Sequence, residues 1–141
     1  MAIIIKKDII KQTLATPTQN GTRLLEPLKS MSIENTMPFN ILDEQASRGD
    51  VEVHTIDNDL WYCIEGETTF LCGGEMIHPI MRKNQDGTDN EHELKGDDIK
   101  NGETIVIRAG DWLWIPAGEP HYHITEKCVR IAIIKIPVHK K

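Results

Sequence analysis

The sequence of 141 residues contains no apolar run of the roughly 18 residues that a membrane-spanning helix needs. Its first residues, Met-Ala-Ile-Ile-Ile-Lys-Lys, form an apolar run that is short and is followed, not preceded, by charge. A secretory signal has the opposite order and a longer apolar core. We therefore expect no membrane association and a cytoplasmic protein.

Cysteine is also scarce. The three cysteines, Cys63, Cys72 and Cys128, include no CxxC pair. An odd number of cysteines without a signal peptide favours reduced thiols over a disulfide framework. Cys63 lies in an apolar strand pattern, so we interpret it as a small buried hydrophobic residue and not as a reactive thiol.

The sequence also has no excess of basic residues. There are 16 lysines and arginines against 22 aspartates and glutamates, which gives a formal net charge of −6. A protein that binds the phosphate backbone needs a basic face, so we expect no nucleic-acid partner. The sequence has no phosphate-binding P-loop, no Gly-x-Ser-x-Gly elbow and no HExxH motif, which argues against the enzyme classes that these motifs mark.

The sequence does contain a series of short β patterns. Its 141 residues are enough for one domain with a single core. These patterns alternate apolar and polar residues, or are rich in β-branched residues, and turns with glycine or proline separate them. They cover residues 38–42, 51–56, 60–65, 68–72, 104–108, 112–115, 121–125 and 129–136. We expect Gly66 and Glu67 to close a hairpin. No convincing helix and no repeat appear, so we predict an all-β barrel or sandwich.

Two segments do not follow this pattern. Residues 1–40 are predicted to be an N-terminal extension, beginning with a short strand or helical turn and continuing as loop, that packs outside a barrel of residues 41–141 or on a partner subunit. Residues 82–102 are strongly polar. They are interpreted either as an exposed loop with little fixed structure or as a lid over a site at the barrel mouth.

Candidate metal ligands are concentrated at two places. Side chains two residues apart on a strand share a face, so Glu52 and His54 project together. Asp59 begins the next strand, across a corner from His54. If the later strand that begins at His121 lies beside the first, all four side chains meet. Three or four nitrogen and oxygen ligands suit Zn²⁺, Fe²⁺, Mn²⁺, Ni²⁺ or Co²⁺.

Two further residues are predicted to serve the same site. His123 shares the face of His121 and could act as a general acid or base near neutral pH, or support a ligand, unless it is an ordinary exposed histidine. Trp61 shares the face of Asp59 and could line a substrate pocket. Core packing is the default expectation for Trp61, and also for Trp112 and Trp114.

The spacing of residues 110–121, G-x5-P-x-G-x2-H, resembles the second motif of the cupin superfamily. Residues 49–66 are similar to the first motif, which has the form G-x5-H-x-H-x3–4-E-x6-G. Glu52 stands where that motif has its first histidine, and Asp59 stands where it has glutamate. The second motif ends in asparagine, and this chain has Thr125 there.

This resemblance implies a double-stranded β-helix, related to the jelly roll, and a homodimer formed through the N-terminal region. It implies a divalent metal held by Glu52, His54, Asp59 and His121. The first functional hypothesis is a metal-dependent enzyme acting on a small organic molecule, either an oxygenase with Fe²⁺ or an isomerase, cyclase or lyase with Zn²⁺, Mn²⁺ or Ni²⁺. The alternative is a non-catalytic protein that binds a small molecule. A catalytic metal needs an exchangeable ligand position, whereas a binding module does not.

Overall fold

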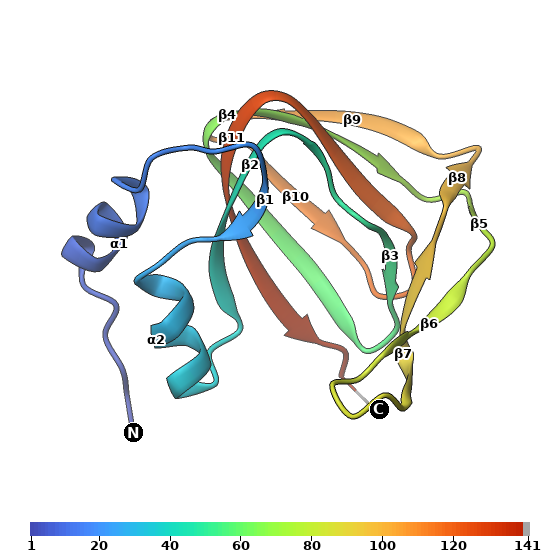
Figure 1. Ribbon diagram of the computed structural model, residues 1–141, viewed down its shortest axis with the longest axis horizontal. Coiled ribbons are helices and arrows are strands. Elements are labelled where there is room, and N and C mark those ends of the chain that lie inside the picture. Colours follow the sequence, from blue (N-terminus) through green and yellow to red (C-terminus); the bar gives the residue numbers. More distant parts are fainter. Residues whose placement is uncertain (140–141) are drawn as a thin grey trace.

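The computed structural model describes residues 1–139, which form eleven strands and two short helices (Figure 1). In chain order these elements are α1 (Lys7–Leu14), β1 (Gly21–Leu24), α2 (Leu28–Asn35), β2 (Phe39–Arg48), β3 (Val51–His54), β4 (Asp57–Cys72), β5 (Glu75–Ile77), β6 (Ile80–Lys83), β7 (Asp89–Gly96), β8 (Asp98–Lys100), β9 (Glu103–Arg108), β10 (Trp112–Ile115) and β11 (His121–Pro137). The predicted all-β class is confirmed.

The strands curve around a common interior (Figure 1). One series of neighbours runs β1-β2-β11-β3-β7-β6, and β4 pairs with β11 as well as with β9 and β10. All these pairs are antiparallel. The long strands β4 and β11 pair along most of their length and so connect the two sides of the barrel. Their inward side chains, together with Leu42 of β2, Ile107 of β9 and Ile115 of β10, form the main apolar core.

The hairpin expected at Gly66 is wrong, because β4 continues through this residue from Asp57 to Cys72. Gly66 has φ +76°, and a Cβ there would lie 2.2 Å from the backbone oxygen of Cys128. Glycine therefore allows β4 to bend where the irregular part of β11 passes close to it. The two strands expected over 121–125 and 129–136 are likewise one strand, β11.

The expectation of no helix is wrong, because two helices, α1 and α2, lie in the predicted extension. Both are only eight residues long, and tertiary packing stabilises helices of this length more than propensity does. Leu25 and Leu28 are buried with Ile41 of β2 in a second apolar cluster, against which Ile9 of α1 packs. The predicted boundary at residue 40 between extension and barrel stays a prediction. Within the extension, β1 pairs with β2 and so belongs to the main sheet.

The polar segment 82–102 is not a loop without structure. β6 and β7 form an antiparallel hairpin, and β7 pairs with β3, the strand of two predicted ligands. β6 is the last strand of this series. Charged residues on such an outer hairpin protect an exposed sheet edge from pairing with another chain. The same charged residues led to the expectation of a loop.

The tryptophans behave differently from one another. Trp61 is buried, as its default expectation requires, whereas Trp112 and Trp114 are 61% and 50% exposed. The core expectation for these two is wrong, because Leu113 and Ile115 provide the inward face of β10. Trp112 packs on Tyr62 of the neighbouring strand with ring centroids 4.4 Å apart. Within residues 1–139, no helix is long and apolar enough to cross a membrane.

The expectation for Cys63 is confirmed. Its side chain is fully buried in the main core, and burial, with a smaller contribution from Asp111, raises its pKa to about 11. A thiol with such a pKa stays protonated at neutral pH and is unreactive as a nucleophile. The homodimer and the cytoplasmic location stay predictions.

Candidate metal centre

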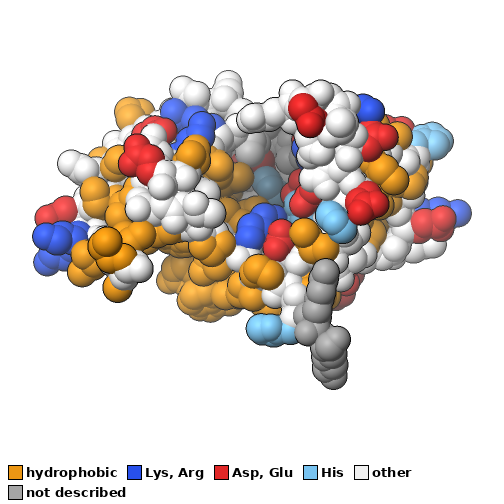
Figure 2. Space-filling view, turned by 90° about the horizontal axis from the view of Figure 1, so that it is seen from below, with side chains coloured by type: hydrophobic (Ala, Val, Ile, Leu, Met, Phe, Trp, Pro, Cys, Tyr) orange, Lys and Arg blue, Asp and Glu red, His pale blue; other side chains and the backbone are white. Residues whose placement is uncertain are grey.

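The structure brings the four predicted ligands to one place inside the barrel. Glu52 and His54 come from β3, Asp59 from the start of β4, and His121 from the start of β11, where it pairs with Glu52. One potential ligand atom from each residue lies within 4.8 Å of the others. His54, Asp59 and His121 are buried, and Glu52 is partly exposed. Figure 2 shows a hollow on this protein with histidine and acidic side chains inside it.

Each histidine donates a hydrogen bond from the ring nitrogen that faces away from the cluster, and this bond orients the ring. Nδ1 of His121 donates to the backbone oxygen of Glu119 at 2.9 Å, and Nδ1 of His54 donates to the carboxylate of Glu93. A histidine that donates through Nδ1 has its lone pair on Nε2 when neutral. The two Nε2 atoms face the carboxylates: the distance is 3.2 Å from His54 to Oε1 of Glu52, and 3.2 Å from His121 to Oδ2 of Asp59.

Two buried atoms in the cluster have no hydrogen-bond partner among the described residues. They are Oδ2 of Asp59 and Nε2 of His121. Buried polar atoms are almost always satisfied, so an unpartnered pair at one point needs an explanation. A cation that accepts lone pairs from both atoms would satisfy them, and these oxygen and imidazole donors suit a divalent metal. The residues present therefore fit a metal.

Without a metal, the cluster favours a protonated His121 beside ionised carboxylates. Burial opposes protonation of His121, but its close contacts with the carboxylates of Asp59 and Glu52 outweigh burial and raise its pKa to about 9. Burial likewise opposes ionisation of both acids, yet their histidine contacts lower the pKa of Glu52 and that of Asp59. A metal at this point therefore has to replace a proton on His121.

Lys135 is part of the cluster and was missed in the sequence. It pairs across the strands with Asp59, and its Nζ donates to Oδ1 of Asp59 at 2.6 Å and to Nε2 of His54 at 2.9 Å. Glu93 was missed too, since it lies in the polar segment that looked like a loop. Residues 89–96 have no alternating apolar pattern that would mark Glu93, so only the pairing of β7 with β3 reveals it, as only the register of β11 against β4 reveals Lys135.

His123 lies on the same strand, but it is buried and not solvent-exposed. Its Nδ1 is 2.7 Å from Oε1 of Glu44, and its ring packs on Trp61 and Phe70 at centroid distances of 5.6 and 5.2 Å. Thr125 donates to the same oxygen of Glu44 at 2.6 Å. The catalytic role of His123 and the pocket role of Trp61 stay predictions.

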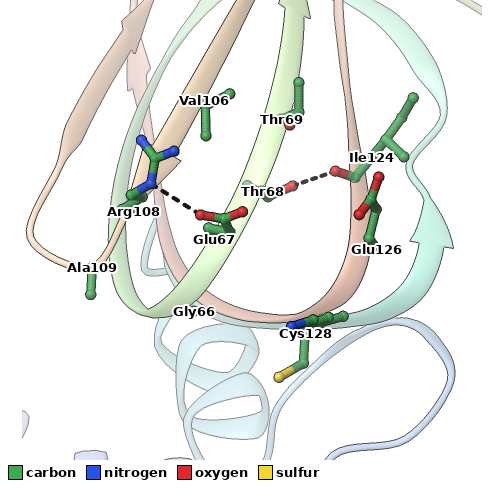
Figure 3. A pocket seen from close by; sticks show the side chains of 11 residues that line it. Gly66, Glu67, Thr68, Thr69, Val106, Arg108, Ala109, Ile124, Glu126 and Cys128 are labelled. Carbon is green, nitrogen blue, oxygen red and sulfur yellow. Dashed lines mark hydrogen bonds and ion pairs between the residues drawn. The ribbon is translucent and has the colours of Figure 1, made fainter.

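A cavity of about 700 Å³ lies elsewhere, at the bend of β4 (Figure 3). None of the four ligands lines it. Three of its polar side chains already have partners: Arg108 pairs with Glu67 at 3.0 Å, and Thr68 donates to the backbone oxygen of Ile124 at 3.1 Å. The candidate ligand cluster therefore lies outside this cavity, and its unpartnered buried atoms mark it instead.

No protein-family model matches the sequence, and no curated protein matches it either. Solved structures match in fold. E. coli ycfD has a TM-score of 0.59 at 13% identity, with 89% of this chain and 36% of that chain covered. An oxalate oxidase in complex with glycolate has a TM-score of 0.51 at 15% identity, with 87% and 53% covered. The Drosophila melanogaster CENP-C cupin domain has a TM-score of 0.50 at 10% identity, with 81% and 64% covered.

These matches confirm the cupin fold that the two motifs predict. At identities of 10% to 15% the likeness shows the fold alone. The chain spans 36% to 64% of the length of these three solved chains. The oxalate oxidase is named for an enzymatic activity, whereas the CENP-C chain is named only as a domain. The chain thus has a cupin fold with a buried cluster of histidine, glutamate and aspartate that could hold a metal.

Proposed function

We propose that this cupin-fold chain is a metal-dependent enzyme that acts on a small organic molecule. Glu52, His54, Asp59 and His121 would hold one divalent ion, with Fe²⁺, Zn²⁺, Mn²⁺ or Ni²⁺ as candidates. The observation that carries the proposal is the pair of buried, unpartnered atoms at the centre of the cluster, Oδ2 of Asp59 and Nε2 of His121. Two imidazoles with two carboxylates favour a metal that prefers oxygen and nitrogen over sulfur.

When bound, such a metal supplies Lewis-acid polarisation of a carbonyl or enolate oxygen, or, if it is iron, oxygen chemistry. The chain's own residues orient the ligands. Glu93 and the backbone oxygen of Glu119 fix the two imidazole rings with Nε2 facing inward. Hydrogen bonds of this kind increase the basicity of a ligand histidine and hold its tautomer.

Access to the cluster is through its partly exposed members. The side chains of Glu52 and Glu93 are each 24% exposed, while Asp59 and His121 are almost completely enclosed. A small molecule therefore approaches from one side, with the apolar core behind the ligands excluding water. His123, held by Glu44 on the same face of β11 as His121, is the proposed acid or base inside the barrel.

One observation favours the alternative, a non-catalytic protein that binds a small molecule. Lys135 already gives the cluster a positive charge, through contacts of 2.6 Å to Asp59 and 2.9 Å to His54. A lysine in this place stabilises the carboxylate of Asp59 without any metal. In that case the barrel would bind its ligand through ordinary polar and apolar contacts.

Titration of EDTA-treated protein with Mn²⁺, read by the relaxation rate of water protons, separates these functions. An enzyme needs a bound metal with an exchangeable water, so we expect enhanced relaxation in the wild type and its loss in Asp59→Asn and His121→Ala. His78→Ala is the matched control, because His78 is exposed and lies outside the cluster. Bound Mn²⁺ without an exchangeable water would favour the non-catalytic protein, and no bound Mn²⁺, Zn²⁺ or Fe²⁺ would remove the proposed metal site.

A further inference from the structure

Lys135 competes directly with a metal for one ligand atom. Nε2 of His54 has a single lone pair, because Nδ1 of the same ring carries the hydrogen that goes to Glu93. In the metal-free arrangement this lone pair accepts from the ammonium of Lys135 at 2.9 Å. If a metal were bound, His54 would donate this lone pair to it, and the lone pair would no longer be available to Lys135.

The same lysine keeps its second partner. Its Nζ lies 2.6 Å from Oδ1 of Asp59, whereas the unpartnered buried oxygen of that carboxylate is Oδ2. Asp59 can therefore use Oδ2 as a metal ligand and Oδ1 to hold the ammonium. An ammonium has three N–H donors, so the loss of His54 leaves at least one donor free beside the metal. The Lys135 side chain is 35% exposed, which makes this donor reachable from solvent.

Charge also changes when the site is loaded. Three carboxylates, Glu52, Asp59 and Glu93, stand against two cations, Lys135 and Arg82, the latter 3.1 Å from Oε2 of Glu52. With both histidines deprotonated, as metal binding requires, these five groups sum to one net negative charge, and a divalent ion would make the sum one net positive charge. The outer pair of Asp50 and Lys95, 3.7 Å apart, adds nothing to this balance. A positive, partly enclosed site attracts an anion and repels a cation.

We propose that Lys135 is the anion-recognition residue of the metal-loaded site, and that its ligand is a small organic carboxylate. This inference rests on the proposed function. One free ammonium donor beside one metal offers two points of attachment, which matches the two oxygens of a carboxylate. A phosphate group would call for more donors. The nearby Arg82 contacts Asp50 and Glu52 through Nη2 at 3.0 and 3.1 Å, so two carboxylates already match its charge.

The test uses protein loaded with Co²⁺, whose visible absorption responds to a change in its ligands. Acetate is titrated as the probe anion and acetamide as its neutral counterpart. Lys135→Met is expected to weaken acetate binding at least about tenfold, because a charge-assisted hydrogen bond is lost, and to leave the response to acetamide unchanged. Lys135→Arg keeps the charge and is expected to restore most of the affinity.

Lys83→Met is the matched control. Lys83 is an exposed lysine on β6 that pairs with Asp89, outside the cluster, so its loss changes the net charge equally without touching the site. Acetate affinity equal in Lys135→Met, Lys83→Met and the wild type, all loaded with Co²⁺, would overturn the role of Lys135 while leaving the metal site intact. Failure of the wild type to bind Co²⁺ would overturn the proposed function and this inference together.

Discussion

His54 and Glu93 face each other across β3 and β7, and Nδ1 of the histidine donates a hydrogen bond to Oε2 of the carboxylate. This contact turns the other nitrogen of the ring toward Glu52, Asp59 and His121. A carboxylate behind a ligand histidine is the usual support of a protein metal site. β7 therefore contributes to the candidate centre although none of its residues is a ligand.

We expect Glu93→Gln to reduce the affinity for Zn²⁺ about 10- to 100-fold, which is the usual cost of removing such a support. Calorimetric titration of EDTA-treated protein measures it. Glu91→Gln is the control, since Glu91 lies on the same strand with a side chain 76% exposed, and the net charge changes equally. Equal affinities in the two variants would contradict a supporting role for Glu93.

Lys135→Met is expected to destabilise the metal-free protein by about 1–3 kcal/mol, because the buried carboxylate of Asp59 loses its hydrogen-bonded cation. In the metal-loaded protein the loss should be smaller, since the metal neutralises the same carboxylate. The increase in Tm on adding Zn²⁺ should therefore be larger in this variant than in the wild type. A smaller increase would show that Lys135 assists metal binding instead of competing with it.

The pH dependence of the metal-free protein follows from the pKa of His121, which is about 9 against an ordinary value of 6.5. Protonation is favoured in the folded state, so its stabilising contribution is full below pH 6.5 and is lost as the pH rises through 9. A rise of this size corresponds to about 3 kcal/mol. Urea unfolding of EDTA-treated protein between pH 6 and 9 measures it, and His121→Gln should flatten the curve. Stability that rises with pH over this window in the wild type would contradict the assignment.

Much of the site follows from local spacing. The period of two along a strand places Glu52 beside His54, and the glycine and proline spacing of residues 110–121 marks the turn before His121. These patterns also predict the cupin fold, which the structural matches confirm. Local spacing is sufficient for Glu52 and His54, which share β3, whereas His121 meets them only because β11 pairs with β3.

What the sequence did not predict depends on contacts between distant strands. Lys135 reaches Asp59 only through the register of β11 on β4, and Glu93 reaches His54 only through β7 on β3. Gly66 appeared to end a strand because glycine is common in turns, whereas here it allows close passage of β11. Trp112 was expected in the core, but the opposite face of its strand points inward.

Gly66→Ala is expected to destabilise the protein by more than about 2 kcal/mol, since the new Cβ would lie 2.2 Å from a backbone oxygen that a long paired strand holds in place. Gly87→Ala separates this clash from the cost of a positive φ. Gly87 has φ +85° and nothing within 4 Å of its Cβ position, so about 1 kcal/mol is expected. Urea unfolding compares the two, and equal losses would mean that the close passage of β11 does not matter.

The metal content of protein purified without added metal tests the central claim most directly. Elemental analysis is made on the wild type, on Asp59→Asn and His121→Ala, and on His78→Ala as the control outside the cluster. We predict about one divalent ion per chain in the wild type and the control, and a loss of most of it in both cluster variants. A wild type without metal, whose Tm does not rise when Zn²⁺, Mn²⁺, Ni²⁺ or Fe²⁺ is added, would contradict the account.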